Sequence, residues 1–261
     1  MTDVAIDRRF EFVSDLVRDA GALAHDYFRR LGTLTVKVKG VQDLASEADV
    51  ETELLIRARI AEAFPEDAFL GEETGMSDLA EGQGIWVVDP IDGTQPFICG
   101  LSSWCVSVAF VRGGEIEIGA LYAPARDELF LARRGAPATL NGAPIAVSTS
   151  ERLDHGLVSL GYSTRVGPEP FYPLVRRLLD QGGMFHREGS GALGLAYVGC
   201  GRLLGYVERH INSWDCLAAI AVVRGAGGVT NDFLAGGGLT GGNPVIAGNP
   251  AVYPALEALL G

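Results

Sequence analysis

The 261-residue sequence predicts a mixed chain, α+β in its first part and α/β in its second, folded as two packed subdomains. Two helix patterns are followed by a run of strand patterns up to about residue 150, and beyond it strand and helix patterns alternate. No repeat, charge block or low-complexity linker separates the two parts. We therefore expect subdomains of about residues 1–150 and 151–261, packed together with a site between them.

The first part begins with two amphipathic helix patterns. Apolar residues three and four positions apart predict helices over residues 9–31 and 48–64, and Pro65 ends the second. Between them, the alternation of TVKVKG at 35–40 predicts a short strand exposed on one face. The pattern then changes to β. A mainly antiparallel sheet is predicted from strands over residues 85–88, 106–111, 116–122, 128–132 and 145–147.

The second part alternates between the two kinds of pattern. Strands are predicted over residues 157–161, 203–207, 228–231 and 244–247. Helices are predicted over residues 170–181, 190–200 and 215–224. Such alternation is typical of an α/β layer.

The charge of the chain excludes two classes of partner. Thirty-three acidic residues against 21 Lys plus Arg give a net charge of −12. Nucleic acids and anionic membranes need clustered basic residues, and the longest basic runs here are pairs, so neither is an expected partner. The N-terminal residues show no export signal and no membrane-spanning apolar run, which indicates a cytoplasmic protein. Four cysteines without metal-ligand spacing are expected to be buried, reduced thiols: Cys99, Cys105, Cys200 and Cys216.

Acidic residues at the ends of predicted elements are the candidate functional groups. In the first cluster, Glu72 and Glu73 follow an apolar residue and a glycine, as at a strand end that faces a crevice. The cluster can supply a metal ligand or can be a solvated loop.

The second cluster, DPIDGT at 89–94, directly follows four apolar strand residues. Asp89 and Asp92 can converge on one hard cation, and the carbonyl of Ile91 offers a third oxygen. Gly93 and Thr94 then present backbone N–H groups to a phosphate at a helix N-terminus. The alternative is a simple Asp-Gly turn capped by Asp92. A buried Asp89 disfavours it, because such a carboxylate needs a cation or several donors.

The third cluster is Trp214-Asp215-Cys216, ahead of an apolar helix that is expected to end at Gly225 or Gly227. Asp215 fits an N-cap or first-turn position, which needs no metal. Taken together, however, the candidate ligands in the three clusters are all oxygen donors, with no His or Cys among them. That donor set favours Mg²⁺ or Mn²⁺ over zinc.

These residues carry a family resemblance. GEE at 71–73, WVVDPIDGT at 86–94, WD at 214–215 with AGG at 226–228, and DLASEAD at 43–49 resemble segments of the inositol monophosphatase family of metal-dependent, lithium-sensitive phosphatases. The resemblance runs from the first helix to the C-terminus. It implies one inositol monophosphatase-like domain over residues 1–261, a layered α-β-α-β-α sandwich and a homodimer.

The resemblance also implies a site. It assigns two or three Mg²⁺ ions, or Mn²⁺ as a substitute, to Glu72, Asp89, the carbonyl of Ile91, Asp92 and Asp215. The implied catalytic residues are Asp49, Thr94 and Glu72, of which the first two polarise the attacking water. The implied substrate-binding residues are Asp92, Gly93, Thr94, Gly189, Ser190, Gly191, Glu208 and Asp215. Glu208 can equally be an exposed strand-end charge.

The implied activity is Mg²⁺-dependent hydrolysis of a small polyol or sugar phosphate, first of all myo-inositol 1-phosphate. Histidinol phosphate is the alternative substrate, because Asn212-Ser213-Trp214-Asp215 resembles the NxWD of that branch and Glu208 could pair with an amine. A non-catalytic binding or regulatory protein is the alternative from another class. Gln95, Pro96 and His210 depart from the family pattern and bear on substrate specificity.

Overall fold

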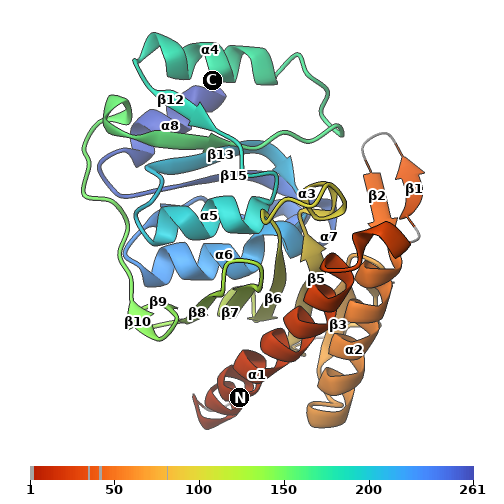
Figure 1. Ribbon diagram of the computed structural model, residues 1–261. Helices are drawn as coiled ribbons and strands as arrows, with labels where there is room; N and C mark the ends of the chain where they lie inside the picture. The colour runs from red at the N-terminus through yellow and green to blue at the C-terminus, as the bar shows by residue number, and fades with distance from the viewer. Residues whose placement is uncertain (1–2, 35, 41–42, 81) are drawn as a thin grey trace.

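The computed structural model describes residues 3–34, 36–40, 43–80 and 82–261. Helices and two main β-sheets alternate in layers through the molecule (Figure 1). The two halves of the chain contribute one sheet each. The larger sheet comes from residues before 150 and the smaller sheet from residues after 150.

The larger sheet is mainly antiparallel, as predicted. Within the described residues its strands lie in the order β10-β9-β8-β7-β6-β5-β3-β4, and β3 with β5 is its parallel pair. Its strands are β3 (Ala68–Gly71), β4 (Gly75–Met76), β5 (Ile85–Asp92), β6 (Cys105–Arg112), β7 (Glu115–Ala123), β8 (Glu128–Arg133), β9 (Thr139–Leu140) and β10 (Ala143–Pro144).

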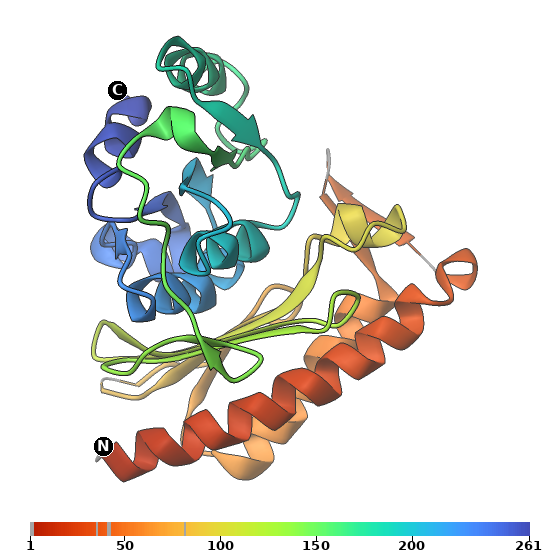
Figure 2. The same cartoon turned by 60° about the vertical axis from the view of Figure 1, so that its left-hand side comes forward.

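Helices α1 (Asp3–Phe28) and α2 (Glu47–Ala63) cover one face of this sheet, as Figure 2 shows. Apolar residues of both helices, such as Val13 and Ile56, pack against Trp86, Val88 and Phe110 of the strands. This burial of an apolar stripe on a sheet face explains why the pattern of α1 was readable in the sequence. The apolar spacing that predicted α2 does not mark its buried face: Leu54 is 50% exposed, whereas Thr52, Ile56 and Ile60 are buried.

Helices α5 (Gly191–Gly199) and α6 (Ser213–Gly225) lie between the two sheets. Most residues of both helices are buried, because each helix contacts a sheet on either side. Their side chains join one core with Leu121 and Phe130 of the larger sheet and Val245 of the smaller one. This middle layer holds the two halves of the chain together.

The smaller sheet has the strand order β12-β11-β13-β15-β14. Its strands are β11 (Leu157–Leu160), β12 (Met184–His186), β13 (Gly205–Ile211), β14 (Val229–Thr230) and β15 (Asn243–Gly248). Helices α4 (Phe171–Asp180) and α8 (Tyr253–Leu260) pack on its outer face through Leu174 and Leu256. The predicted α-β-α-β-α sandwich is therefore confirmed.

Shorter elements complete the chain: η1 (Leu31–Thr33), β1 (Val36–Gly40), β2 (Asp43–Ser46), α3 (Thr94–Ile98), η2 (Leu153–His155), η3 (Ala235–Gly237) and α7 (Gly238–Gly241). Strands β1 and β2 form an antiparallel hairpin. The strand predicted over 35–40 corresponds to β1, while residue 35 lies outside the described residues.

One predicted strand is wrong. Residues 145–147 are not in a strand, and the pairing next to them is a two-residue hairpin of β9 with β10 that ends at Pro144. After the hairpin the chain leaves the sheet: Ile145 N–H donates to Ala138 O at 3.0 Å, but Val147 N–H donates to Ala226 O, beyond α6, at 3.1 Å. The apolar pattern at 145–147 thus reflects packing between the layers.

Sequence patterns also missed several short elements and misplaced the ends of some longer ones. Strands β2, β4 and β12 and helix α8 are too short to show a clear period, whereas the strand end predicted before Glu72 is the end of β3. The first helix, predicted over 9–31, runs from Asp3 to Phe28, and residues 31–33 form a separate, tighter 3₁₀ turn. The strand predicted over 203–207 is β13, at 205–211. These differences fall at short elements and element ends, where tertiary contacts decide the structure.

The cysteines are free thiols, but their burial differs from the prediction. Cys105 and Cys216 are buried and Cys200 is half-buried, whereas Cys99 is exposed. Cys99 follows the short helix α3, which leaves the sheet and reaches the surface. Among the described residues, no helix combines the length and apolarity that a bilayer crossing requires.

Candidate metal centre and active site

The site is built at the carboxyl end of β5. All eight residues of this strand are buried, so its last carboxylates stand at the edge of a packed core. Asp89 is 1% exposed, and its Oδ1 accepts a hydrogen bond of 2.9 Å from the N–H of Ile91. This local turn fixes the carboxylate and directs the chain toward Asp92.

Three carboxylates, including that of Asp89, converge from three separate elements at this end of β5. Glu72 follows β3, Asp89 belongs to β5, and Asp215 lies in the first turn of α6. One oxygen from each lies within 4.8 Å of the others, and within the part of the chain that the structure describes this group is the candidate metal site. Burial first, and then the charges of Glu72, Asp92 and Asp215, raise the pKa of Asp89 well above its usual range.

Whether a cation fits this site follows from how closely the three carboxylates lie together. Like charges this close disfavour their common ionisation, and only a cation or shared protons can offset the repulsion. The donors are all oxygens, which suits a hard divalent cation. The residues present therefore fit Mg²⁺.

Asp215 is held by the cap of α6. The structure places Asn212 at the N-cap and Asp215 three residues later, so the N-cap position considered for Asp215 is wrong and the first-turn position is correct. Asp215 Oδ2 accepts from the backbone N–H of Asn212 at 3.2 Å and from its side-chain amide at 3.1 Å. Helix α6 ends at Gly225, one of the two ends predicted.

Asp92 lies next to this group but faces a different partner. Its carboxylate accepts from the hydroxyl of Ser190 and from the backbone N–H groups of Gly191 at 3.3 Å and Ala192 at 2.7 Å. These are the first groups of α5, whose N-terminus therefore stabilises the charge. Burial nevertheless raises the pKa of Asp92 to about 7. The hydroxyl of Ser190 and the backbone N–H of Gly191, which were expected to contact the substrate, thus donate hydrogen bonds to Asp92.

Asp49 and Thr94 form a second, adjoining pair. Thr94 Oγ1 lies 3.2 Å from Asp49 Oδ1 and 3.2 Å from the carbonyl oxygen of Ile91. Asp49 Oδ2 accepts from the backbone N–H of Ser46 at 2.8 Å and from its hydroxyl at 2.6 Å, in a capping box that starts α2. Burial raises the pKa of Asp49.

A cleft of about 940 Å³ opens in front of these groups. The predicted site residues that line it are Glu72, Gly93, Thr94, Gly189, Glu208 and Asp215. A smaller adjoining hollow of about 130 Å³ is lined by the remaining predicted substrate residues Asp92, Ser190 and Gly191, and Gly189, Glu208 and Asp215 line both cavities. The structure therefore brings the predicted residues to one place.

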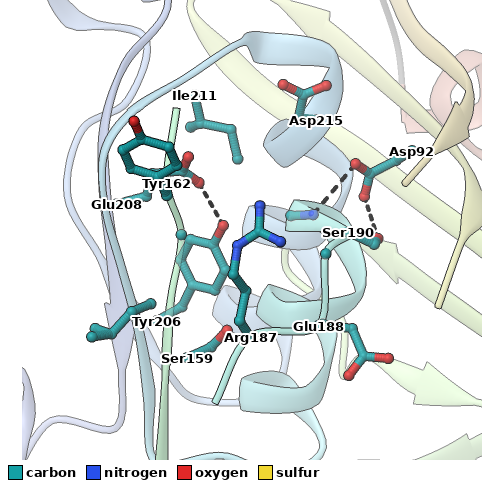
Figure 3. A pocket seen from close by; sticks show the side chains of 14 residues that line it. Asp92, Ser159, Tyr162, Arg187, Glu188, Ser190, Tyr206, Glu208, Ile211 and Asp215 are labelled. Atoms are coloured by element: carbon teal, nitrogen blue, oxygen red, sulfur yellow. Dashed lines mark hydrogen bonds between the residues drawn. The ribbon is translucent and has the colours of Figure 1, made fainter. Parts of the chain in front are cut away.

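Glu208 is a buried residue of β13 and not an exposed strand-end charge. It is 6% exposed, and its Oε2 accepts a hydrogen bond of 2.6 Å from the hydroxyl of Tyr206, as Figure 3 shows. Burial raises the pKa of Glu208 to about 8. Gly161 makes room for this pair, because a Cβ there would lie 2.1 Å from Glu208 Oε2.

The sequence left several residues of the cleft without an assigned role. Tyr206 stands two positions before Glu208 on the same face of β13, and that period of two was the available signal. The side chain of Arg187 reaches into the hollow between Tyr206 and Ser190 (Figure 3). Arg187 and Arg165 line the larger cleft, and no pattern in the sequence marked Arg165.

The departures from the family pattern lie at the same cleft. Gln95 and His210 line it, and His210 Nε2 is 3.1 Å from the carbonyl oxygen of Gly241. Pro96 is buried under the loop before α5, where a Cβ on Gly189 would lie 2.8 Å from its ring. These side chains shape the walls around the carboxylates and leave the carboxylates in place.

The layered sandwich and its carboxylate centre at a cleft place the protein in the class of the phosphoric monoester hydrolases. A family model described as "Inositol monophosphatase family" matches residues 6–260. The chain belongs to the inositol monophosphatase family.

Curated relatives and solved structures agree with this assignment. The chain is 32% identical over 262 residues to the inositol-1-monophosphatase of Rhizobium meliloti strain 1021, covering 100% of this chain and 96% of that protein. It is 34% identical over 243 residues to the Nus factor SuhB of Escherichia coli K12, covering 92% and 91% of the two chains. The crystal structure of the extragenic suppressor protein suhB from Bartonella henselae has a TM-score of 0.89 at 32% identity, covering 96% of this chain and 97% of that one. The Thermotoga maritima IMPase has a TM-score of 0.85 at 30% identity, covering 97% and 96%.

Proposed function

We propose that this protein is a Mg²⁺-dependent phosphomonoesterase that hydrolyses a small polyol or sugar phosphate, with myo-inositol 1-phosphate as the first candidate substrate. The observation that carries this proposal is the convergence of Glu72, Asp89 and Asp215 within 4.8 Å at the cleft. Family membership supports the same chemistry.

The residues proposed to hold the metal are Glu72, Asp89, the carbonyl of Ile91, Asp92 and Asp215. Divalent cations bound there supply the positive charge that lowers the pKa of water and neutralises the leaving ester oxygen. They also offset the negative charge that these carboxylates present to an anionic substrate. We therefore infer that substrate binding itself requires the cation.

The chain's own residues contribute to catalysis a proton acceptor, Asp49, and the hydroxyl group of Thr94, both held in a fixed orientation. Asp49 Oδ1 faces Thr94 Oγ1 at 3.2 Å, and Ser46 holds the other oxygen of Asp49, so this pair has a fixed orientation. We assign to Asp49 and Thr94 the orientation of the attacking water, with its proton passing to Asp49. Burial raises the pKa of Asp49, which makes it a better proton acceptor than an exposed carboxylate.

Phosphate release from myo-inositol 1-phosphate tests this function. We expect activity with Mg²⁺ and its loss on addition of EDTA. Asp89→Asn keeps the side-chain shape and removes one charge, so kcat/KM should fall by more than about 100-fold with the fold retained by circular dichroism. Asp78→Asn, at an exposed position, is the matched control. Activity that survives both EDTA and Asp89→Asn would overturn the proposal.

The substrate is distinguished by its organic part. The hollow beside Glu208 is lined by Tyr206, Arg187 and the backbone of Gly161, groups that hydrogen-bond to hydroxyls. Comparing kcat/KM for myo-inositol 1-phosphate, histidinol phosphate and fructose 1,6-bisphosphate ranks the candidates. We expect the polyol to be preferred over the amine, because a Glu208 with a pKa of about 8 is largely protonated at neutral pH. A preference for histidinol phosphate would favour the alternative enzyme. Cation-dependent binding of these esters with no turnover of any would favour a non-catalytic role.

We also propose that the protein is a homodimer. Strand β12 is an edge of the smaller sheet, and its Met184 and Phe185 are 56% and 48% exposed. Exposed apolar residues at a sheet edge favour association with another chain. Phe185→Glu should produce a monomer in analytical ultracentrifugation, and Val4→Glu, at another exposed apolar position, should not. A monomeric wild-type protein would contradict the proposal.

A further inference from the structure

We propose that Glu53 is a positioning residue that holds the turn carrying Glu72 in the geometry needed for metal binding. This inference rests on the proposed function, because it gives Glu72 the role of a metal ligand. Glu53 lies on α2, outside the group of carboxylates that converge at the cleft.

Both carboxylate oxygens of Glu53 are committed to the turn that follows Glu72. Oε2 accepts from the backbone N–H of Glu73 at 2.9 Å, and Oε1 accepts from that of Thr74 at 2.7 Å. On its other side, the turn is tied to the sheet by a 3.2 Å hydrogen bond from Glu72 N–H to Val88 O. The backbone around Glu72 is therefore fixed from both directions.

The environment of Glu53 shows that this contact is built into the core. Glu53 is 0% exposed, so its carboxylate has exchanged water for these two N–H donors. Hydrogen bonds from an N–H group to a buried carboxylate are stronger than those between neutral groups. Gly71 leaves the space that the carboxylate fills, since a Cβ at Gly71 would lie 2.4 Å from the carboxyl carbon of Glu53.

Helix α2 links this support to the other half of the site. Asp49 and Glu53 are one helical turn apart and both are buried, so they face the same side of α2. Asp49 contacts Thr94, and Glu53 contacts the Glu72 turn. One rigid helix therefore sets the spacing between the proposed water-orienting pair and a proposed metal ligand. Supporting contacts of this kind change metal affinity about 10–100-fold when removed.

The test measures metal binding directly. Mn²⁺ is titrated into metal-free protein, and the free ion is followed by electron paramagnetic resonance. Glu53→Gln replaces one acceptor oxygen by an N–H₂ group that cannot accept, so we expect the dissociation constant for Mn²⁺ to rise at least 10-fold. The Mg²⁺ concentration for half-maximal activity should rise by a similar factor, and excess Mg²⁺ should restore most of kcat. Glu62→Gln, exposed on the same helix, should match the wild type.

A second variant disturbs the contact between Glu53 and the turn after Glu72 without removing a charge. Gly71→Ala forces the Glu53 carboxylate away from the two N–H groups, and should weaken Mn²⁺ binding as Glu53→Gln does. Gly32→Ala, where a Cβ meets nothing within 4 Å, is its control. If either site variant is folded by circular dichroism and binds Mn²⁺ as the wild type does, the role of Glu53 is overturned. If the wild type itself binds no Mn²⁺, the result overturns the proposed metal-dependent function, on which the role of Glu53 rests.

Discussion

At the scale of single residues, the environment of each carboxylate separates the members of the site. Asp89 and Asp215 crowd one another beside Glu72, Asp92 is bound by the start of α5, and Glu208 is bound by Tyr206. We therefore propose that the same side-chain chemistry serves metal binding in one place and substrate contact in another. Burial is the largest cause of the raised pKa in Asp92 and Glu208.

The hydrogen bond from Tyr206 to Glu208 gives the residue-scale prediction. Tyr206→Phe removes a donor 2.6 Å from a buried carboxylate, so the pKa of Glu208, already about 8, should rise further. We expect KM for the polyol phosphate to increase about 10-fold, with the Mg²⁺ requirement unchanged. The pH dependence of kcat/KM and a Mg²⁺ titration measure the two effects. Tyr172→Phe, at a residue 64% exposed, is the control, and an unchanged KM in Tyr206→Phe would contradict the prediction.

The sequence predicted the carboxylates of the site better than their partners. Asp89 and Glu72 were readable because each follows apolar residues at a strand end, and Asp215 because it precedes an apolar helix. That Gly191 donates its N–H to Asp92 was not readable, because the contact joins residues 99 positions apart in the sequence. Glu53 was missed for the same reason, since its partners lie 20 and 21 positions away and its place in a helix carried no signal.

At the scale of elements, the ends of strands and helices determine the site. Strands β3 and β5 are parallel neighbours, so Glu72 and Asp89 leave the same edge of the sheet together. Helices α2, α5 and α6 each direct an N-terminus toward that edge and bind a carboxylate there through Ser46, Ser190 or Asn212. Long elements with a clear apolar period were predicted, whereas β12 and α8 depend on contacts that no local pattern shows.

The cap of α6 gives the element-scale prediction. Asn212→Ala removes the N-cap side chain, which should lower the free energy of unfolding by about 1 kcal/mol and also weaken Mg²⁺ binding through Asp215. Asn212→Ser keeps a good cap but lacks the amide that donates to Asp215 at 3.1 Å. We therefore expect Ser to restore stability and to leave metal affinity reduced. Urea denaturation in EDTA and Mg²⁺ titration of activity measure the two separately. Equal metal affinity in all three proteins would contradict the assigned role of Asn212.

At the scale of the whole molecule, the layers explain how distant segments form one centre. The larger sheet supplies Asp89 and Asp92, the middle helices supply Asp215 and the start of α5, and the smaller sheet supplies Glu208. Part of the net charge of −12 comes from carboxylates that are gathered at this one cleft, several of them buried. Folding must therefore bring together groups that repel one another when no cation is present.

This concentration of buried carboxylates predicts how pH and metal jointly control stability. The folded pKa values of Asp92, about 7, and Glu208, about 8, exceed the ordinary values near 4, so the metal-free folded state binds more protons than the unfolded state. Their contribution to stability is complete below about pH 4 and is lost as pH rises through 7 and 8. In EDTA we expect Tm to fall by about 5 °C or more between pH 6 and pH 9.

Mg²⁺ should remove most of that loss, because a cation that binds the folded state favours the ionised carboxylates and adds its own binding free energy. Differential scanning calorimetry at both pH values, with EDTA or with Mg²⁺, measures the four conditions. Asp92→Asn carries no titrating group at this position, so its Tm in EDTA should depend less on pH than that of the wild type. A metal-free Tm that rises from pH 6 to pH 9 would show that these carboxylates are ionised in the folded protein without a cation.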